Sequence, residues 1–159
     1  LEVGDGIHVD AALRTSDPSI YAVGDVAAAW HPFLQTRVRV EHWANALNQP
    51  ATAAAAMLGG NAQYDELPFF FSDQYDLGLE YIGYAPDWLY GKIVVRGDLA
   101  AREFIAFWLG RDGRLLAGMN VNVWDVVDDV KALIRPRQVM DESALRDPGI
   151  PLSSLVLGR

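Results

Sequence analysis

The sequence predicts an α+β fold: an antiparallel β meander with a helix packed on one face, preceded by the last strand and helix of an α/β domain. Three observations carry this prediction. In the second half of the chain, three apolar runs follow one another at short intervals, at 93–95, 104–109 and 115–123. Apolar residues then recur with helical spacing from Val126 to Ile134. In the first third, a short apolar run is followed by an Ala-rich segment, the order of an α/β unit.

The meander rests on turn chemistry as well as on the apolar runs. Arg111-Asp112-Gly113-Arg114 joins the second and third runs, and Asp-Gly between apolar runs is a strong signal for a tight hairpin. The next segment puts several apolar residues on one helical face. We therefore expect this helix to cover one face of the sheet.

The first third is expected to form short strands and one helix. Residues 6–10 form a brief strand, and residues 20–23 form a strand of a parallel sheet that ends at Gly24-Asp25. Residues 43–58 are Ala-rich, precede Gly59-Gly60 and predict a helix, which Pro50 bends or delays. The polar stretch that follows predicts a boundary, with one part at 1–65 and another at 66–159.

Composition excludes several classes of function. The 159 residues carry a formal charge of −8, which argues against nucleic-acid binding. The longest apolar run falls short of the roughly 20 residues of a membrane helix, so no membrane partner is expected. The absence of Cys excludes a disulfide or thiolate–metal site within the chain, and the three scattered His residues predict no metal site. A cytoplasmic location fits this composition.

Gly24 and Asp25 are the first candidate site residues. At the carboxyl end of the expected strand, Asp25 lies where α/β folds bind ligands, and Gly24 allows a close approach of the backbone. A carboxylate there accepts strong hydrogen bonds from sugar hydroxyls. From residue chemistry alone, Asp25 as the cap of a helix or turn stays an alternative.

The segment 39–46 is the second candidate, because it leads into the Ala-rich helix. The amino-terminal amides and the dipole of a helix favour electron-rich oxygen. From residue chemistry alone, Trp43 is a core aromatic, with Glu41 and His42 as a surface pair.

Residues 15–25, Thr-Ser-Asp-Pro-Ser-Ile-Tyr-Ala-Val-Gly-Asp, resemble the second FAD motif of the pyridine-nucleotide-dependent flavoprotein reductases. In that family the final Asp binds the ribitol of FAD. The resemblance spans nearly the whole chain and is to the ferredoxin reductases in particular. It implies that Gly24 and Asp25 bind FAD and that Trp43 contacts FAD near the isoalloxazine.

Residues 68–76 resemble the aromatic-rich opening of the ferredoxin-reductase C-terminal domain. Many relatives carry Trp at the positions of Phe69 and Phe71. The resemblance places Phe71 near the flavin and near the surface where the iron–sulfur partner docks, without the N–H of an indole. Core packing is the expectation for Phe70.

The resemblance implies an oxidoreductase that passes electrons from NAD(P)H through FAD to a ferredoxin-type iron–sulfur protein. No Gly-x-Gly-x-x-Gly occurs, although both dinucleotides need such a loop in these folds. The opening residues also lack an initiator Met. We therefore expect a C-terminal piece of the enzyme that has no catalytic residue of its own, binds FAD weakly and is inactive alone.

Two other readings stay open at this point. The related apoptosis-inducing-factor-like flavoproteins share the architecture, so residues 66–159 are alternatively a dimerisation or partner-docking module, with a homodimer as one form. A disulfide-reducing flavoenzyme is disfavoured, because such enzymes end in a domain with a His-Glu pair and no His follows His42. The choice between NADH and NADPH stays undecided.

Overall fold

The computed structural model describes residues 1–156. Contacts divide the chain into two compact units, Leu1–Pro68 and Phe69–Arg159. Within the described residues, no helix combines the length and the apolar character needed to cross a membrane.

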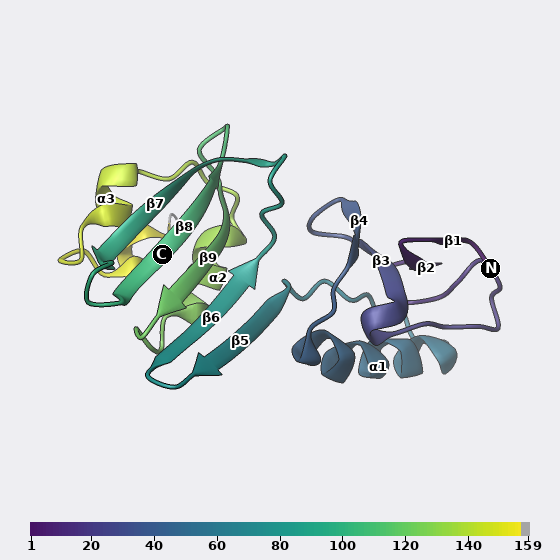
Figure 1. Ribbon diagram of the computed structural model, residues 1–159. Coiled ribbons are helices and arrows are strands. Elements are labelled where there is room, and N and C mark those ends of the chain that lie inside the picture. The colour runs from purple at the N-terminus through teal and green to yellow at the C-terminus, as the bar shows by residue number, and fades with distance from the viewer. Residues whose placement is uncertain (157–159) are drawn as a thin grey trace. The chain divides into compact units, whose positions relative to one another are not determined.

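The first unit is built on a small mixed sheet with one helix (Figure 1). Its strands within the described residues are β1 (Val3–Gly4), β2 (Gly6–Val9), β3 (Ala27–His31) and β4 (Thr36–Arg39), in the order β1-β2-β3-β4. β2 and β3 pair in parallel, and the other pairs are antiparallel. A single 3₁₀ turn, η1 (Gly24–Val26), precedes β3, and the helix α1 (Trp43–Met57) follows β4. The predicted brief strand at 6–10 is confirmed.

The predicted strand at 20–23 is wrong. This segment forms only an isolated bridge, between Tyr21 and Arg14, and its backbone bonds stay local, from Thr15 N–H to the Ile20 carbonyl and from Ala22 N–H to the Leu13 carbonyl. The parallel partner of β2 is β3, which comes after Asp25 rather than before it. An Ala-rich strand was not predicted because Ala has a low β propensity. Its alanines are nevertheless buried, with Ala27 and Ala29 in one core cluster with Ala53 of α1.

The helix α1 begins at Trp43 and includes Pro50, so of the two predicted alternatives, a bend at Pro50 or a late start, the late start is wrong. Its buried residues are Asn45, Gln49, Ala53 and Ala56, a stripe with helical spacing along one face. Two of these four residues carry amides. The face of α1 that turns inward is therefore small and polar rather than large and apolar.

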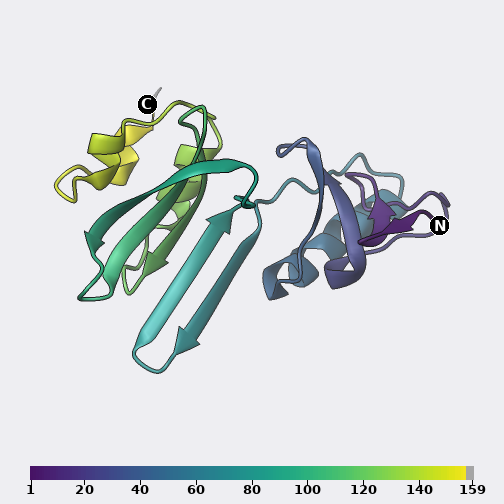
Figure 2. The same ribbon diagram turned by 45° about the horizontal axis from the view of Figure 1, so that its top comes forward.

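The second unit is a five-stranded antiparallel sheet within the described residues (Figure 2). Its strands are β5 (Phe69–Gln74), β6 (Leu77–Gly83), β7 (Tyr90–Asp98), β8 (Glu103–Gly110) and β9 (Leu115–Val121), in the order β5-β6-β9-β8-β7. β7, β8 and β9 form the predicted meander, and the Asp112-Gly113 hairpin is confirmed, with Gly113 at a φ of +80°. The β5–β6 hairpin, which was not predicted, joins the sheet through β9.

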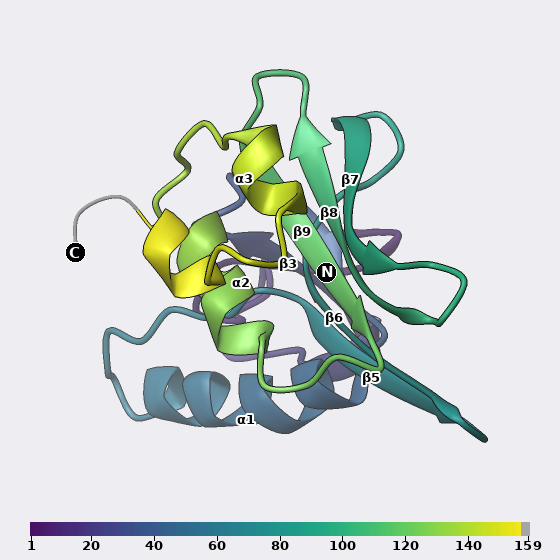
Figure 3. The same cartoon turned by 90° about the vertical axis from the view of Figure 1, so that its left-hand side faces the viewer.

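The helices of the second unit lie on one face of this sheet (Figure 3). They are α2 (Val127–Ile134), α3 (Glu142–Arg146) and the 3₁₀ turn η2 (Leu152–Leu155). The sheet residues Val94, Phe107 and Ile82 on this face are buried, and a Cβ built on Gly118 would lie 2.6 Å from Val130 Cγ1 of α2. The α+β class and the helix packed on one face are therefore as predicted.

The opposite face of the sheet carries aromatic side chains. Phe70 stacks on Tyr81 with ring centroids 5.2 Å apart, and Tyr81 meets Trp108 edge-on at 5.6 Å. Each of these rings is half-buried. Offset and edge-to-face pairs of this kind stabilise a sheet beyond simple area burial.

Candidate functional site

The candidate site in the first unit is the turn η1. Gly24 has a φ of +73°, in the left-handed region that favours glycine. Its N–H donates a 2.8 Å hydrogen bond to Oε1 of Gln49 on α1. From β4, Nη1 of Arg39 donates a 3.1 Å bond to the Asp25 carbonyl. The turn is thus held from two sides by side chains that come from later in the chain.

Gly24 is needed for its backbone conformation. A Cβ built on it would lie 3.5 Å from the Ala46 Cβ, which is ordinary van der Waals contact. The sequence predicted that Gly24 permits a close approach of the backbone. Toward helix α1, however, a side chain at this position would make only an ordinary contact. The positive φ is the stronger requirement.

The Asp25 side chain is exposed, and its carboxylate takes part in no hydrogen bond or ion pair with the residues that the structure describes. Ion pairing in this region involves its neighbours instead, since Arg39 pairs with both Asp5 and Glu41. The turn therefore presents a carboxylate that is anchored through its backbone and is accessible to a hydrogen-bond donor. Asp25 lies inside η1 and does not cap α1.

The start of α1 lies next to this turn in the structure. Its N-cap residue, His42, makes no side-chain capping bond. Trp43, the first helical residue, is 71% exposed, so it is not a core aromatic of this unit. Burial lowers the pKa of His42, and the carboxylates of Asp25 and Glu41 partly oppose this effect. A Cβ built on Gly24 would lie 3.5 Å from the Cβ of Ala46 in the first turn of α1, so the turn and the helix start are neighbours.

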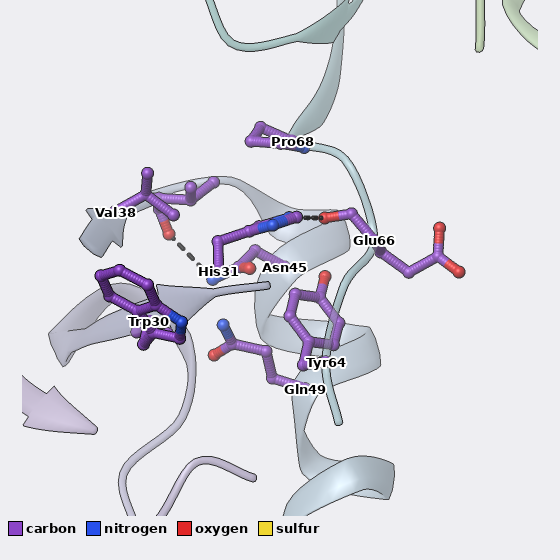
Figure 4. A pocket seen from close by; sticks show the side chains of 10 residues that line it. Trp30, His31, Val38, Asn45, Gln49, Tyr64, Glu66 and Pro68 are labelled. Atoms are coloured by element: carbon purple, nitrogen blue, oxygen red, sulfur yellow. Dashed lines mark hydrogen bonds between the residues drawn. The ribbon is translucent and has the colours of Figure 1, made fainter. Parts of the chain in front are cut away.

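A small cavity lies under α1, and its lining is shown in Figure 4. His31, Asn45, Gln49 and Tyr64 contribute polar groups to it. His31 Nε2 lies 3.0 Å from the Glu66 carbonyl, and its Nδ1 accepts a 3.3 Å bond from Leu34 N–H. The cavity measures about 10 Å³, about the space of one water molecule. It is therefore too small for any part of a dinucleotide.

Phe71 belongs to the second unit. It lies on the edge strand β5, opposite Glu80 of β6, and is 54% exposed. Phe70 next to it is half-buried in the aromatic row, in line with a packing role. Phe71 is therefore available for contact with a ligand or partner.

Sequence reasoning missed Gln49, and it did not single out Arg39 or Asn45. Asn45 donates a 3.0 Å bond from Nδ2 to the Val40 carbonyl, which fixes the approach to α1. A signal was present, because Asn45, Gln49 and Ala53 recur every four residues on one helical face. Amides on the small-residue face of an Ala-rich helix indicate buried hydrogen-bonding roles.

The described residues contain no group of three or more His, Cys, Asp or Glu side chains that could hold a metal ion. The chemistry available in the chain is that of a carboxylate, a helix start and exposed aromatic rings. Such groups bind and orient a ligand, and they include no nucleophile paired with a base.

Two family models match the chain. The model described as "Reductase C-terminal" matches residues 69–156, more than half of the chain. The model described as "Pyridine nucleotide-disulphide oxidoreductase" matches residues 1–50.

The chain is similar to the anthranilate 1,2-dioxygenase system ferredoxin–NAD(+) reductase component of Burkholderia cepacia, with 42% identity over 98% of this chain and 38% of that protein. It is 38% identical to putidaredoxin reductase CamA of Pseudomonas putida, over 98% of this chain and 36% of the relative. A crystal structure of the covalent putidaredoxin reductase–putidaredoxin complex matches with a TM-score of 0.88 and 35% identity, over 98% of this chain and 36% of the matched chain.

The chain thus spans less than two fifths of the length of these relatives. Both matched segments follow the order that the motifs predicted, with the flavoprotein segment first and the reductase C-terminal segment second. The chain therefore belongs to the ferredoxin reductase-like pyridine nucleotide-disulphide oxidoreductases, with a reductase C-terminal domain at residues 69–156.

Proposed function

We propose that the full-length protein is an FAD-dependent oxidoreductase that passes electrons from NAD(P)H to a ferredoxin-type iron–sulfur protein. The observation that carries the proposal is the anchored turn at Gly24-Asp25, with its accessible carboxylate next to the start of α1. This turn stands in a chain that aligns over nearly its whole length with ferredoxin reductases.

The residues present fit one end of FAD. The accessible Asp25 carboxylate accepts hydrogen bonds from polyol hydroxyls such as those of ribitol, and bonds to a charged acceptor are the stronger class. FAD, when bound, accepts hydride from the nicotinamide and releases single electrons. Here Asp25 holds the ribitol, and the Gly24 backbone sets the position of that carboxylate. The pyrophosphate and the NAD(P)H site need glycine-rich loops that this sequence does not contain.

Trp43 and the start of α1 border the ring system in this proposal. The amino-terminal amides of a helix carry partial positive charge and stabilise negative charge on a neighbouring group. Trp43 is exposed by 71%, which supports a role in contact with a planar ligand rather than in the core.

Phe71 supplies the contribution of the second unit. Its half-exposed ring is proposed to contact the flavin or the iron–sulfur partner. The relatives support a small iron–sulfur protein as the partner, since one is a ferredoxin–NAD(+) reductase component and another forms a covalent complex with putidaredoxin. Because the reaction consumes NAD(P)H, we place it in the cytoplasm.

The test is the visible spectrum of the full-length protein, recorded anaerobically before and after addition of NADH or NADPH. A flavin spectrum that bleaches with one nucleotide supports the proposal and identifies the donor. Electron transfer is then followed with a ferredoxin as acceptor. Asp25→Asn is expected to weaken FAD binding, whereas the exposed Asp87→Asn serves as the charge-matched control and should bind FAD normally. A colourless protein that cannot be reconstituted with FAD contradicts the proposal.

Assembly is the second candidate function, favoured by the sheet face that carries Phe70, Tyr81 and Trp108. These half-buried rings form a continuous aromatic row on the face opposite α2. Exposed apolar patches are often interaction sites. Sedimentation velocity of the full-length holoprotein tests this role: a concentration-dependent dimer that Tyr81→Ser abolishes supports it, and a monomer at all concentrations contradicts it.

A further inference from the structure

We infer that Gln49 is a positioning residue for the flavin, acting through the Gly24-Asp25 turn; the inference rests on the proposed FAD-binding function. Gln49 lies on α1, a full 25 residues from Gly24 in sequence, and is only 3% exposed. Its Oε1 accepts the Gly24 N–H at 2.8 Å in the protein interior. Gln49 is thus tied to the residue directly before the proposed ribitol ligand.

The bond matters because of the conformation of Gly24. With a φ of +73°, Gly24 departs from both regular strand and regular helix. A buried backbone N–H without an acceptor is costly, so the acceptor on α1 selects this conformation. Without it, the turn has to move its N–H toward another acceptor, and Asp25 moves with it.

Among the contacts of the turn, Gln49 provides the hydrogen bond to helix α1. Arg39 reaches the Asp25 carbonyl from β4, and a Cβ built on Gly24 would lie 3.5 Å from the Cβ of Ala46 on α1. The only hydrogen bond from an α1 side chain to the turn within the described residues is that of Gln49. Gln49 therefore fixes the position of the Gly24-Asp25 turn relative to α1, and with it the position of Asp25.

The amide of Gln49 suits this place better than its nearest alternatives. Asn is one methylene shorter and falls short of Gly24. Met has similar length but offers only a weak sulfur acceptor. Glu keeps an oxygen at the same position in either protonation state. Gln49→Met should therefore lose the bond, and Gln49→Glu should largely keep it.

The experiment measures the FAD dissociation constant of the full-length protein, after removal of the flavin, by fluorescence titration. Gln49→Met and Asp25→Ala are each expected to weaken FAD binding by about 10- to 100-fold, the range for loss of one hydrogen bond to a charged group. The double variant should bind no more weakly than Asp25→Ala, because Gln49 acts only through Asp25. Gln49→Glu should bind within a few-fold of the wild type.

Ala53→Gly is the matched control for stability. It weakens the same helix at a buried site one turn later, away from Gly24, and should leave FAD affinity unchanged. If Gln49→Met fails to fold, as judged by far-UV circular dichroism, Gln49→Asn tests the loss of the same hydrogen bond, because its shorter side chain does not reach Gly24.

The outcomes separate the inference from the proposed function. If the effects of Gln49→Met and Asp25→Ala multiply, or if Gln49→Met binds FAD like the wild type, the positioning role is overturned while FAD binding through Asp25 stands. If Asp25→Ala itself leaves FAD affinity unchanged, the ribitol role of Asp25 fails, and the role of Gln49 fails with it.

Discussion

Substitution of Gly24 by Ala tests the physical reason for glycine at the candidate site. The left-handed conformation costs a non-glycine residue about 1–2 kcal/mol. The structure adds no steric term, because the new Cβ would meet only Ala46, at distances of 3.5 Å and more. The lower chain entropy of Ala in the unfolded state returns about 0.4–1 kcal/mol. The net loss of unfolding free energy is therefore expected to be about 1 kcal/mol.

Gly59→Ala is the matched control for this prediction. Gly59, just after α1, has a φ of +83°, and a Cβ built there has nothing within 4 Å. Ala at position 59 has the same unfavourable backbone conformation but makes no new contact. The two variants should therefore show a similar decrease in the free energy of unfolding. Gly24→Asn should lose less than Gly24→Ala, because Asn tolerates the left-handed region better.

Thermal unfolding followed by circular dichroism is the assay. For a chain of this size, 1 kcal/mol corresponds to a decrease in Tm of about 2–4 °C. The reasoning fails if Gly24→Ala is as stable as the wild type while Gly59→Ala is not, or if Gly24→Ala is far more damaging than Gly59→Ala. The second result would mean that Gly24 is needed for close packing.

The remaining predictions concern His42, Tyr81 and Gly118. Burial lowers the pKa of His42, and the Asp25 carboxylate partly offsets this effect. Asp25→Asn should therefore lower the His42 pKa further in an NMR titration of the imidazole. A rise in this pKa would contradict the placement of Asp25. As the pH falls, the imidazole of His42 is protonated in the unfolded chain before it is protonated in the folded chain. The first unit should therefore become less stable below about pH 6.5, and His42→Gln should remove that part of the pH dependence. Burial raises the pKa of Tyr81 to about 12, so its absorbance change near 295 nm should occur at a higher pH than that of an exposed tyrosine. Stability should fall between about pH 10 and 12, because the tyrosine of the unfolded chain ionises first. Ionisation of all tyrosines near pH 10 in the folded protein would refute this prediction. Gly118→Ala would place a Cβ 2.6 Å from Val130 and should lower the free energy of unfolding in urea by about 1–3 kcal/mol. Val130→Ala in the same chain should recover part of that loss. Purely additive effects would show that the side chains at the two positions do not clash.

Local chemistry was enough to predict much of the second unit. The runs that became β7, β8 and β9 are rich in apolar and β-branched residues, and Asp112-Gly113 supplies the turn that joins the last two. The helix α2 followed from apolar spacing alone. These features depend on residues that are neighbours in sequence, so they can be predicted from the sequence.

The wrong predictions concern features that depend on contacts between residues far apart in the sequence. The apolar run at 20–23 looks like a strand, yet its bonds close locally on residues 13–15, and the parallel partner of β2 is the Ala-rich β3. Asn120 of β9 is polar but buried, and its Nδ2 donates to Oε2 of Glu80 and to the Val123 carbonyl. Alternation along a strand gives the period but not which face is covered, because that depends on where α2 packs.

The candidate site shows the same division. The motif from Thr15 to Asp25 and the position of Trp43 could be read from the sequence, because each depends on residue type and order. That Gly24 is held in a left-handed turn by Gln49, and Asp25 by Arg39, could not, since these contacts join residues 25 and 14 positions apart. Such side-chain bonds form only after β4 and α1 have packed around the turn, so the sequence by itself determined which groups are available and the tertiary structure decided how they are held.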